Sequence, residues 1–327
     1  MTPARRRMLQ GIGALAGIVA LGAPGRAFAA GGGGAIRAVA SIKPIHSLLA
    51  GVMAGIGEPA LLVQGHASPH SYSLKPSDAA LLEEADLVFW VGEPVETFLE
   101  RPLEALGGRA EVIELLEIDG VSLLASRGGG LWEPHRHEGA AEAEADEAVE
   151  AEAHGHGLDG HIWLDPANAK AIVGRMAGAL ALQDPVHASR YSDNAAALRA
   201  RIDALDREMA TWLAPVRDKP FIVFHDAYQY LEAHFGLNAM GSITVNPEQS
   251  PSAERLAQIQ AKIAGTGAVC VFAEPQFSEA LVRTATEGST ARSGTLDPEA
   301  TDIPPGPDLY FVLMRNLARS LATCLMK

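Results

Sequence analysis

Short apolar segments alternate with segments of helical periodicity over most of this chain of 327 residues. In the first third, apolar segments at 36–40, 60–63, 86–91 and 111–115 are separated by helical patterns at 44–56, 77–85 and 95–106. Continuous apolar segments of this length are typical of strands buried on both faces, which occur in parallel sheets covered by helices. The sequence therefore predicts an α/β fold that is built from parallel βαβ units.

The alternation is interrupted in the middle of the chain and then resumes. Residues 165–215 are helical with one break, and apolar residues recur at helical spacing from Tyr191 to Leu213. Past Pro215 the apolar segments are 221–224, 239–245, 269–273 and 291–295, with a helix capped by Ser250-Pro251 among the intervening helices and a last helix at 308–326. We expect two lobes of βαβ units, at 35–160 and 216–327, joined by linker helices over 165–215.

The first 29 residues have the pattern of an export signal peptide. Arg5 to Arg7 precede an apolar segment from Met8 to Leu21, and Ala27-Phe28-Ala29 offers small residues to a signal peptidase. We expect cleavage after Ala29, and export by either the general or the twin-arginine route. The apolar segment is short for a membrane anchor, which is the alternative. The mature chain is then expected to be soluble, in the periplasm.

The charge balance excludes one class of function. The formal net charge is −14 at neutral pH, and no basic stripe is present that could follow a phosphate backbone. Nucleic acid is therefore not an expected partner. An acidic surface instead attracts cations.

A polar insert at 128–160 consists largely of Gly, Ala, Glu and His, and we expect it to be disordered. It contains two close histidine pairs, His135 with His137 and His154 with His156. Our hypothesis is that the insert collects cations weakly beside a tighter site. A merely solubilising linker is the alternative, although acidity alone does not require paired histidines.

Three histidines lie where parallel sheets place their ligands, beyond the carboxyl ends of strands. His70 follows the segment 60–63, His225 follows 221–224, and His161 ends the insert before a tight Asp-Pro turn. Neutral imidazoles that meet between two lobes suit Zn²⁺, at about 2.0–2.1 Å from each nitrogen. His66 competes with His70 in the same loop. His46, His187 and His234 lie in helical patterns and are expected to be structural.

The chain has two cysteines, Cys270 and Cys324. In an exported protein an oxidising compartment favours a disulfide between them, and two buried thiols are the alternative. Cys270 lies in an apolar strand segment and Cys324 in the last helix. Either arrangement places the last helix against the second sheet, and the wide spacing excludes a metal site made from a close cysteine pair.

Several long motifs resemble the periplasmic zinc-binding proteins of high-affinity zinc ABC importers. They occur in the order found in that family and span essentially the whole mature chain. The motifs are PHSYSLKPSD at 69–78, GHIWLDP at 160–166, FHDAYQY at 224–230, CVFAEPQF at 270–277 and GTLDP at 294–298.

This resemblance implies two α/β lobes joined by a long rigid helix, with one metal at the lobe interface. By motif, the metal ligands correspond to His70, His161 and His225, and the metal is Zn²⁺ carried as transported ligand. The resemblance also implies that Cys270 and Cys324 form a disulfide. It further implies a monomer that performs no catalysis and hands zinc to the membrane permease of a zinc ABC transporter.

Two departures from the family pattern leave the fourth metal ligand open. Some relatives have an acidic residue before the first histidine, where this chain has Pro69. Related manganese binders use a carboxylate in a region that matches Asp297, so the fourth ligand is either Asp297 or water. Three imidazoles without a carboxylate favour zinc, because hard cations prefer oxygen ligands. Asp226 and Glu274 are candidates for orienting the rings, although Asp226 is also placed to cap the next helix.

Two other functions fit parts of the same pattern. One is a manganese binder or an adhesin on the same scaffold, which metal analysis would distinguish. The other is a zinc hydrolase with three histidine ligands and an open coordination position. The chain has no His-Glu-x-x-His helix and no Gly-x-Ser-x-Gly turn, so we do not expect an enzyme.

Overall fold

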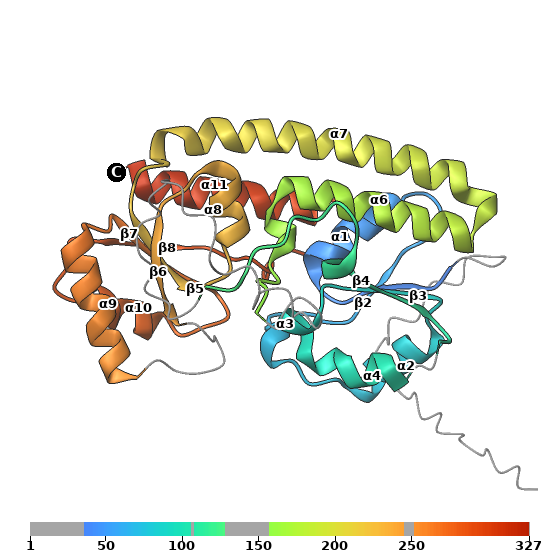
Figure 1. Ribbon diagram of the computed structural model, residues 1–327, viewed down its shortest axis with the longest axis horizontal. Helices are drawn as coiled ribbons and strands as arrows, with labels where there is room; N and C mark the ends of the chain where they lie inside the picture. Colours follow the sequence, from blue (N-terminus) through green and yellow to red (C-terminus); the bar gives the residue numbers. More distant parts are fainter. Residues whose placement is uncertain (1–35, 106–107, 128–156, 245–251, 327) are drawn as a thin grey trace, which may run out of the picture.

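The computed structural model describes residues 36–105, 108–127, 157–244 and 252–326. It contains two four-stranded parallel sheets with the strand orders β2-β1-β3-β4 and β6-β5-β7-β8. Figure 1 shows the two sheets in separate lobes beneath a layer of long helices. The predicted α/β fold with two lobes of parallel strands and a long helix is therefore confirmed.

The N-terminal sheet is buried on both faces, which explains the continuous apolar segments. In β3, Leu87 and Phe89 join one core cluster, while Val88 and Trp90 join the cluster on the opposite face. The strands are β1 Ala38–Ala40, β2 Ala60–Leu61, β3 Leu87–Trp90 and β4 Glu111–Glu114. The helices are α1 Lys43–Val52, α2 Pro76–Glu84, α3 Glu93–Glu96 and α4 Glu100–Ala105, with 3₁₀ turns η1 Pro69–Ser71, η2 Thr97–Leu99 and η3 Leu115–Glu117.

The C-terminal lobe repeats this design. Its strands are β5 Phe221–His225, β6 Ala239–Thr244, β7 Cys270–Ala273 and β8 Arg292–Thr295. Its helices are α8 Gln229–Phe235, α9 Ala253–Thr266, α10 Glu279–Thr286 and α11 Leu309–Met326. Two details differ from expectation. The cap of α9 is Ser252, whose side chain accepts a hydrogen bond from the Arg255 amide, and His225 is the last residue of its strand.

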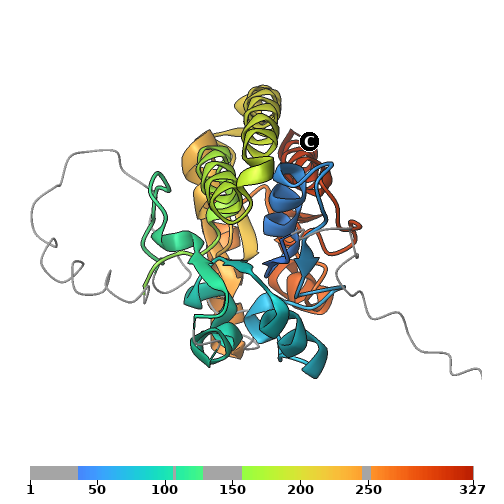
Figure 2. The ribbon, with the colours of Figure 1, turned by 90° about the vertical axis from the view of Figure 1, so that its right-hand side faces the viewer.

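Two long helices connect the lobes. They are α6 Pro166–Gln183 and α7 Ala188–Leu213, flanked by the 3₁₀ turns η5 Ile162–Leu164, η6 Pro185–His187 and η7 Ala214–Val216. Asp165 caps α6 by accepting a hydrogen bond from the Ala167 amide at 2.7 Å. One face of α7 is buried along its whole length, from Tyr191 to Leu213. In Figure 2, seen at right angles to Figure 1, α7 lies over α6 and α11.

One hydrophobic core cluster runs through both lobes and the helical layer. It includes Ile45 from α1, Leu205 from α7, Phe221 from β5 and Leu317 from α11, all at most 1% exposed. Each such side chain contributes about 1.5–3 kcal/mol by leaving water. Opening the lobes widely would expose this shared core, so the fold resists large hinge motion.

The two cysteines form a disulfide that ties α11 to β7. Cys270 and Cys324 have Cα atoms 6.2 Å apart and are separated by 54 residues in sequence. Closing a loop of this length contributes on the order of 4 kcal/mol in the chain-entropy model. The expected disulfide is thus present, and it fixes the last helix against the second sheet.

Some sequence predictions concern residues outside the described ranges. These are the signal peptide at 1–29 and the insert histidines His135, His137, His154 and His156. The insert prediction was wrong at 157–160, because this end is ordered. Ser126 donates its amide to the Gly157 carbonyl at 2.7 Å, and Asp159 donates to the Leu124 carbonyl at 2.9 Å. No helix within the described ranges is long and apolar enough to cross a membrane.

Candidate metal site

Three histidines from distant parts of the chain meet at the lobe interface. His70 lies in η1 after β2, His225 ends β5, and His161 directly precedes η5. One ring nitrogen of each lies within 4.8 Å of the other two. The ring centroids are 5.2–5.6 Å apart. His225 is at the carboxyl end of its strand, where parallel sheets place ligands, and His70 and His161 reach the same place from η1 and from the residue before η5.

Buried carboxylates orient two of the three rings. Nδ1 of His161 lies 2.7 Å from Oδ1 of Asp159, and Nδ1 of His225 lies 2.7 and 2.8 Å from the two oxygens of Glu274. A carboxylate accepts hydrogen bonds, so it keeps the proton on Nδ1. In the neutral rings Nε2 of His161 and of His225 therefore presents a lone pair to the interface.

These lone pairs converge on one point. Nε2 of His225 lies 3.3 Å from Nε2 of His161. Nε2 of His70 is buried and has no hydrogen-bond partner among the described residues. Neutral imidazoles held with their lone pairs facing one another repel, and a cation between them reverses the sign of the interaction. Three nitrogen donors at such spacing match the ligand set of Zn²⁺.

The electrostatic setting differs between the rings. Burial lowers the pKa of His70 well below its usual value, and the neighbouring His161 and His225 lower it further. Burial also opposes the charged form of His225, but Glu274, with smaller contributions from Asp226 and Asp159, raises its pKa overall. In the metal-free protein, His225 therefore gains a proton more readily than His70 does.

Two further ligand candidates from the sequence, Asp297 and His66, contact other groups. Asp297 is engaged in its own loop, where it accepts hydrogen bonds from the amides of Glu299 at 3.1 Å and Thr301 at 2.6 Å. It does not belong to the group of converging metal-ligating atoms found in the described chain. His66 is also elsewhere, with its side chain 70% exposed and 3.6 Å from Asp302.

The histidines that were expected to be structural contact other groups. His46 donates from Nε2 to the Pro59 carbonyl when that nitrogen carries the proton, at 3.1 Å. His187 lies 2.6 Å from Asp184. His234 lies between Asp165 and Asp206, at 2.8 and 2.9 Å.

Sequence reasoning identified Glu274 as a possible ring partner but missed Asp159 and misread Asp226. Asp159 is two residues before His161, and an Asp-x-His pattern is the signal that could have revealed it. Asp226 does not cap α8, which begins after Tyr228 without a side-chain cap. Its carboxylate instead pairs with the guanidinium of Arg127.

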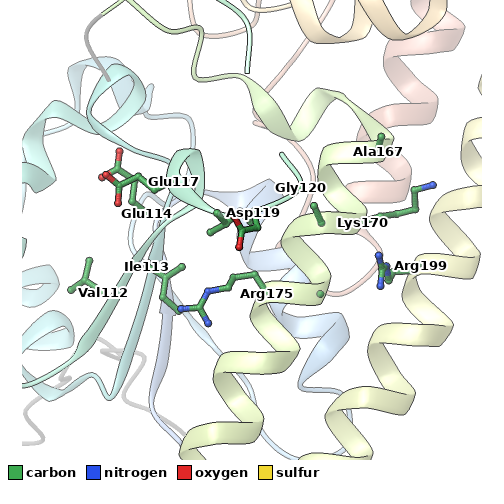
Figure 3. A pocket seen from close by; sticks show the side chains of 13 residues that line it. Val112, Ile113, Glu114, Glu117, Asp119, Gly120, Ala167, Lys170, Arg175 and Arg199 are labelled. Carbon is green, nitrogen blue, oxygen red and sulfur yellow. The ribbon is translucent and has the colours of Figure 1, made fainter. Parts of the chain in front are cut away.

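The site opens into a cleft of about 560 Å³. The lining includes His70, His161, His225, Arg127, Asp159 and Asp226. A larger hollow of about 680 Å³ lies between β4 and the helices α6 and α7, and Figure 3 shows acidic residues from β4 and the segment after it together with basic residues from α6 and α7. Arg175 and Lys170 in that hollow pair with Glu111 and Asp203, and it has no histidine in its lining. The cleft with the three rings is therefore the candidate site.

Comparison with known proteins shows what the chain is similar to. The family model described as zinc-uptake complex component A, periplasmic, matches residues 38–324. The high-affinity zinc uptake system protein ZnuA of Brucella suis biovar 1 (strain 1330) is 48% identical over 307 residues, which cover 88% of this chain and 91% of that protein. A crystal structure of ZnuA is 25% identical, with a TM-score of 0.72 over 89% of this chain and 99% of that one. A ZnuA deletion mutant with zinc bound is 26% identical, with a TM-score of 0.72 over 89% and 98%.

Proposed function

Because the chain belongs to the family of periplasmic zinc-uptake component A proteins, we propose that it captures Zn²⁺ between its lobes with His70, His161 and His225. The observation that carries this assignment is the convergence of one ring nitrogen from each of the three histidines. Asp159 and Glu274 hold Nε2 of His161 and of His225 as lone-pair donors. Zinc is the cargo, and the protein is a solute-binding component that performs no covalent chemistry.

The ligand set supports zinc over manganese. Imidazole nitrogens suit Zn²⁺, whereas Mn²⁺ prefers carboxylate and carbonyl oxygens. Nδ1 of the two histidines is bonded to Oδ1 of Asp159 and to both oxygens of Glu274, and backbone amides are bonded to Asp297. No carboxylate joins the three imidazoles in the group of converging ligand atoms among the described residues. A zinc ion held by three imidazoles completes four-coordination with water, and this is our assignment of the fourth position.

The remaining steps follow from the role of the family in an uptake complex. The export of the chain by its first 29 residues, its action as a monomer and the transfer of zinc to a membrane permease are part of this proposal. Transfer requires that the metal be released without unfolding the shared core. Protonation of an imidazole supplies one route, because a protonated ring cannot bind the metal.

The experiment that tests the site is a zinc titration of His70→Ala, His161→Ala and His225→Ala combined in one chain. The wild type is expected to bind one zinc tightly at this site, and the triple variant is expected to lose that binding event. His187→Ala is the matched control, since its ring lies on the surface beside Asp184. Circular dichroism checks that each variant is folded. A folded triple variant that binds zinc as tightly as the wild type excludes the proposed ligands.

A further inference from the structure

One arginine in the metal cleft holds two carboxylates of the opposite lobe. Arg127 ends the described part of the chain before the insert, and its side chain is only 10% exposed. Its Nε donates to both oxygens of Asp226 at 3.0 and 3.1 Å, and Nη2 also donates to Asp226. Nη1 and Nη2 donate to Glu232 at 2.7 and 3.1 Å. One guanidinium therefore occupies acceptor positions on both carboxylates.

Asp226 is the carboxylate of interest, because it is beside the metal ligands. It directly follows His225 and lines the same cleft as the three rings and Arg127. It is close enough for its charge to act on both His161 and His225. The other carboxylates next to the rings, Asp159 and Glu274, are bound to Nδ1 atoms. Asp226 is the one whose main partner is a cation.

The chemistry of Asp226 matters for metal choice. A carboxylate oxygen is a ligand that Mn²⁺ and other hard cations prefer, and three imidazoles plus a carboxylate form a mixed nitrogen and oxygen site. A guanidinium bound to both oxygens neutralises the charge and uses the lone pairs that a metal would need. The arginine also cannot be deprotonated at any physiological pH, so its charge is available to Asp226 throughout that range.

We propose that Arg127 is a specificity-determining residue, which withholds Asp226 from the metal and so keeps the site an all-imidazole site that prefers zinc to manganese. This inference rests on the proposed zinc site. Arg127 acts through Asp226 and is a positioning residue with no ligand role of its own.

A purely structural role is the alternative, and the surrounding contacts argue against it. The segment that carries Arg127 is attached to α8 by other bonds, since Leu124 donates its amide to the Tyr230 hydroxyl at 3.0 Å and Gln229 donates to the Ala125 carbonyl at 3.1 Å. Ser126 is bonded to Gly157 as well. Moreover, a buried arrangement of charges is weak evidence for a stabilising role, because desolvation opposes the attraction.

The test compares variants that differ in one carboxylate. Arg127→Met with Glu232→Gln releases Asp226 without leaving a second buried charge, and the same pair with Asp226→Asn removes it. Zn²⁺ affinity is measured by competition with a chelating dye, and Mn²⁺ affinity by the electron paramagnetic resonance of the free ion. We expect the ratio of zinc to manganese affinity to fall by about 10-fold or more in the first variant. In the second we expect it to return to near the wild-type ratio.

Arg175→Met, which breaks an ion pair with Glu111 in the larger hollow, is the matched control and should leave the ratio unchanged. Equal ratios in the two Arg127 variants would overturn the inference, as would an unchanged ratio in both relative to the wild type. These outcomes leave the zinc site intact. A wild-type protein that binds no zinc would instead contradict the proposed function, so the two failures are distinguishable.

Discussion

The two halves of the metal site are held in different ways. On one side, His161 and His225 are fixed by buried carboxylates at Nδ1. On the other side, no carboxylate among the described residues accepts a hydrogen bond from His70, which lies in a 3₁₀ turn of three residues. That turn is anchored through Asp78, which accepts hydrogen bonds from the Tyr72 hydroxyl at 2.8 Å and the Lys75 amide at 2.9 Å.

This difference shows that one site can combine two kinds of preorganisation. Carboxylate partners determine which nitrogen of His161 and His225 carries the proton, and Glu274 raises the pKa of His225 against the effect of burial. A backbone turn positions His70 without a carboxylate partner, and burial, followed by the neighbouring His161 and His225, lowers its pKa. The first half of the site is sensitive to protons and to its charged partners, and the second half is sensitive to the geometry of a loop.

The largest expected effects come from removing one ligand on each side. His225→Ala and His70→Ala should each weaken zinc binding by more than about 100-fold, which exceeds the range for residues that act only through a ligand.

The two variants should also differ in the stability of the metal-free protein. His225→Ala leaves the Glu274 carboxylate, 1% exposed, without its ring partner, at a cost of about 1–3 kcal/mol. His70→Ala leaves no such group. Urea unfolding of both metal-free variants measures this, and equal losses of stability would contradict the comparison.

A smaller effect is expected from the carboxylate partner itself. Glu274→Gln should weaken zinc binding by about 10–100-fold at pH 7.5, and Asp159→Asn should give a similar loss at the other oriented ring. Glu279→Gln, on the exposed first turn of α10, is the control and should leave zinc affinity unchanged. Zinc titration by competition with a chelator measures all three. A normal affinity in Glu274→Gln would mean that the carboxylate is not needed to orient His225.

The same variant tests the pH dependence. In the proposed site zinc binds the neutral ring of His225, and Glu274 raises the pKa of that ring. Wild-type affinity should therefore fall as pH falls through a value above the ordinary one of about 6.5. Glu274→Gln should move this fall to lower pH. In the metal-free protein, the pair of protonated His225 and Glu274 stabilises the fold. This stabilisation is fully present below the pKa of His225 in the unfolded chain, and it is lost as pH rises through the higher pKa of His225 in the folded protein. An unshifted pH profile in Glu274→Gln would refute this assignment.

The smallest expected effect concerns the loop that carries His70. Tyr72→Phe removes the hydrogen bond to the Asp78 carboxylate, and a bond to a charged group is worth about 1.5–3 kcal/mol. Because Asp78 still accepts the Lys75 amide, only part of this loss reaches His70, and zinc affinity should fall by less than about 10-fold. Because this residue acts only through His70, the substitution should have no further effect in the His70→Ala background. A double-mutant cycle measures that coupling. Additive losses would show that Tyr72 affects the site by another route.

Much of the fold could be predicted from local patterns. The strand β3 lies within the apolar segment 86–91, and α6 begins after the predicted Asp165 cap. The errors occurred where a distant contact decides the local structure. Residues 157–160 are ordered through hydrogen bonds to the segment before the insert, and composition alone does not reveal such pairing. The helix predicted to begin with a cap at Ser250-Pro251 is capped by Ser252, since the ends of a helix are uncertain by one or two residues when read from sequence.

The residues of the candidate site also fall into those predicted from local patterns and those revealed only by distant contacts. The three histidines were identified from strand ends and family motifs, and Glu274 from its motif. Asp159 was missed although it is near His161 in sequence, and Arg127 was missed because its partners are in the other lobe. The sequence also left Asp297 open as a ligand, because only the three-dimensional loop shows that the amides of Glu299 and Thr301 are bonded to its oxygens.

By itself, the sequence determined the alternation of strands and helices, the two-lobe order and the identity of three candidate ligands. Those features depend on hydrophobic periodicity and on which residue follows a strand, and both are local properties of a chain. Only the tertiary structure decided which nitrogen of His161 and of His225 is bonded to a carboxylate and which carboxylates are already engaged. The physical reason is that hydrogen bonds and ion pairs act over about 3 Å. The groups that make them here come together only after the lobes have packed around one shared core.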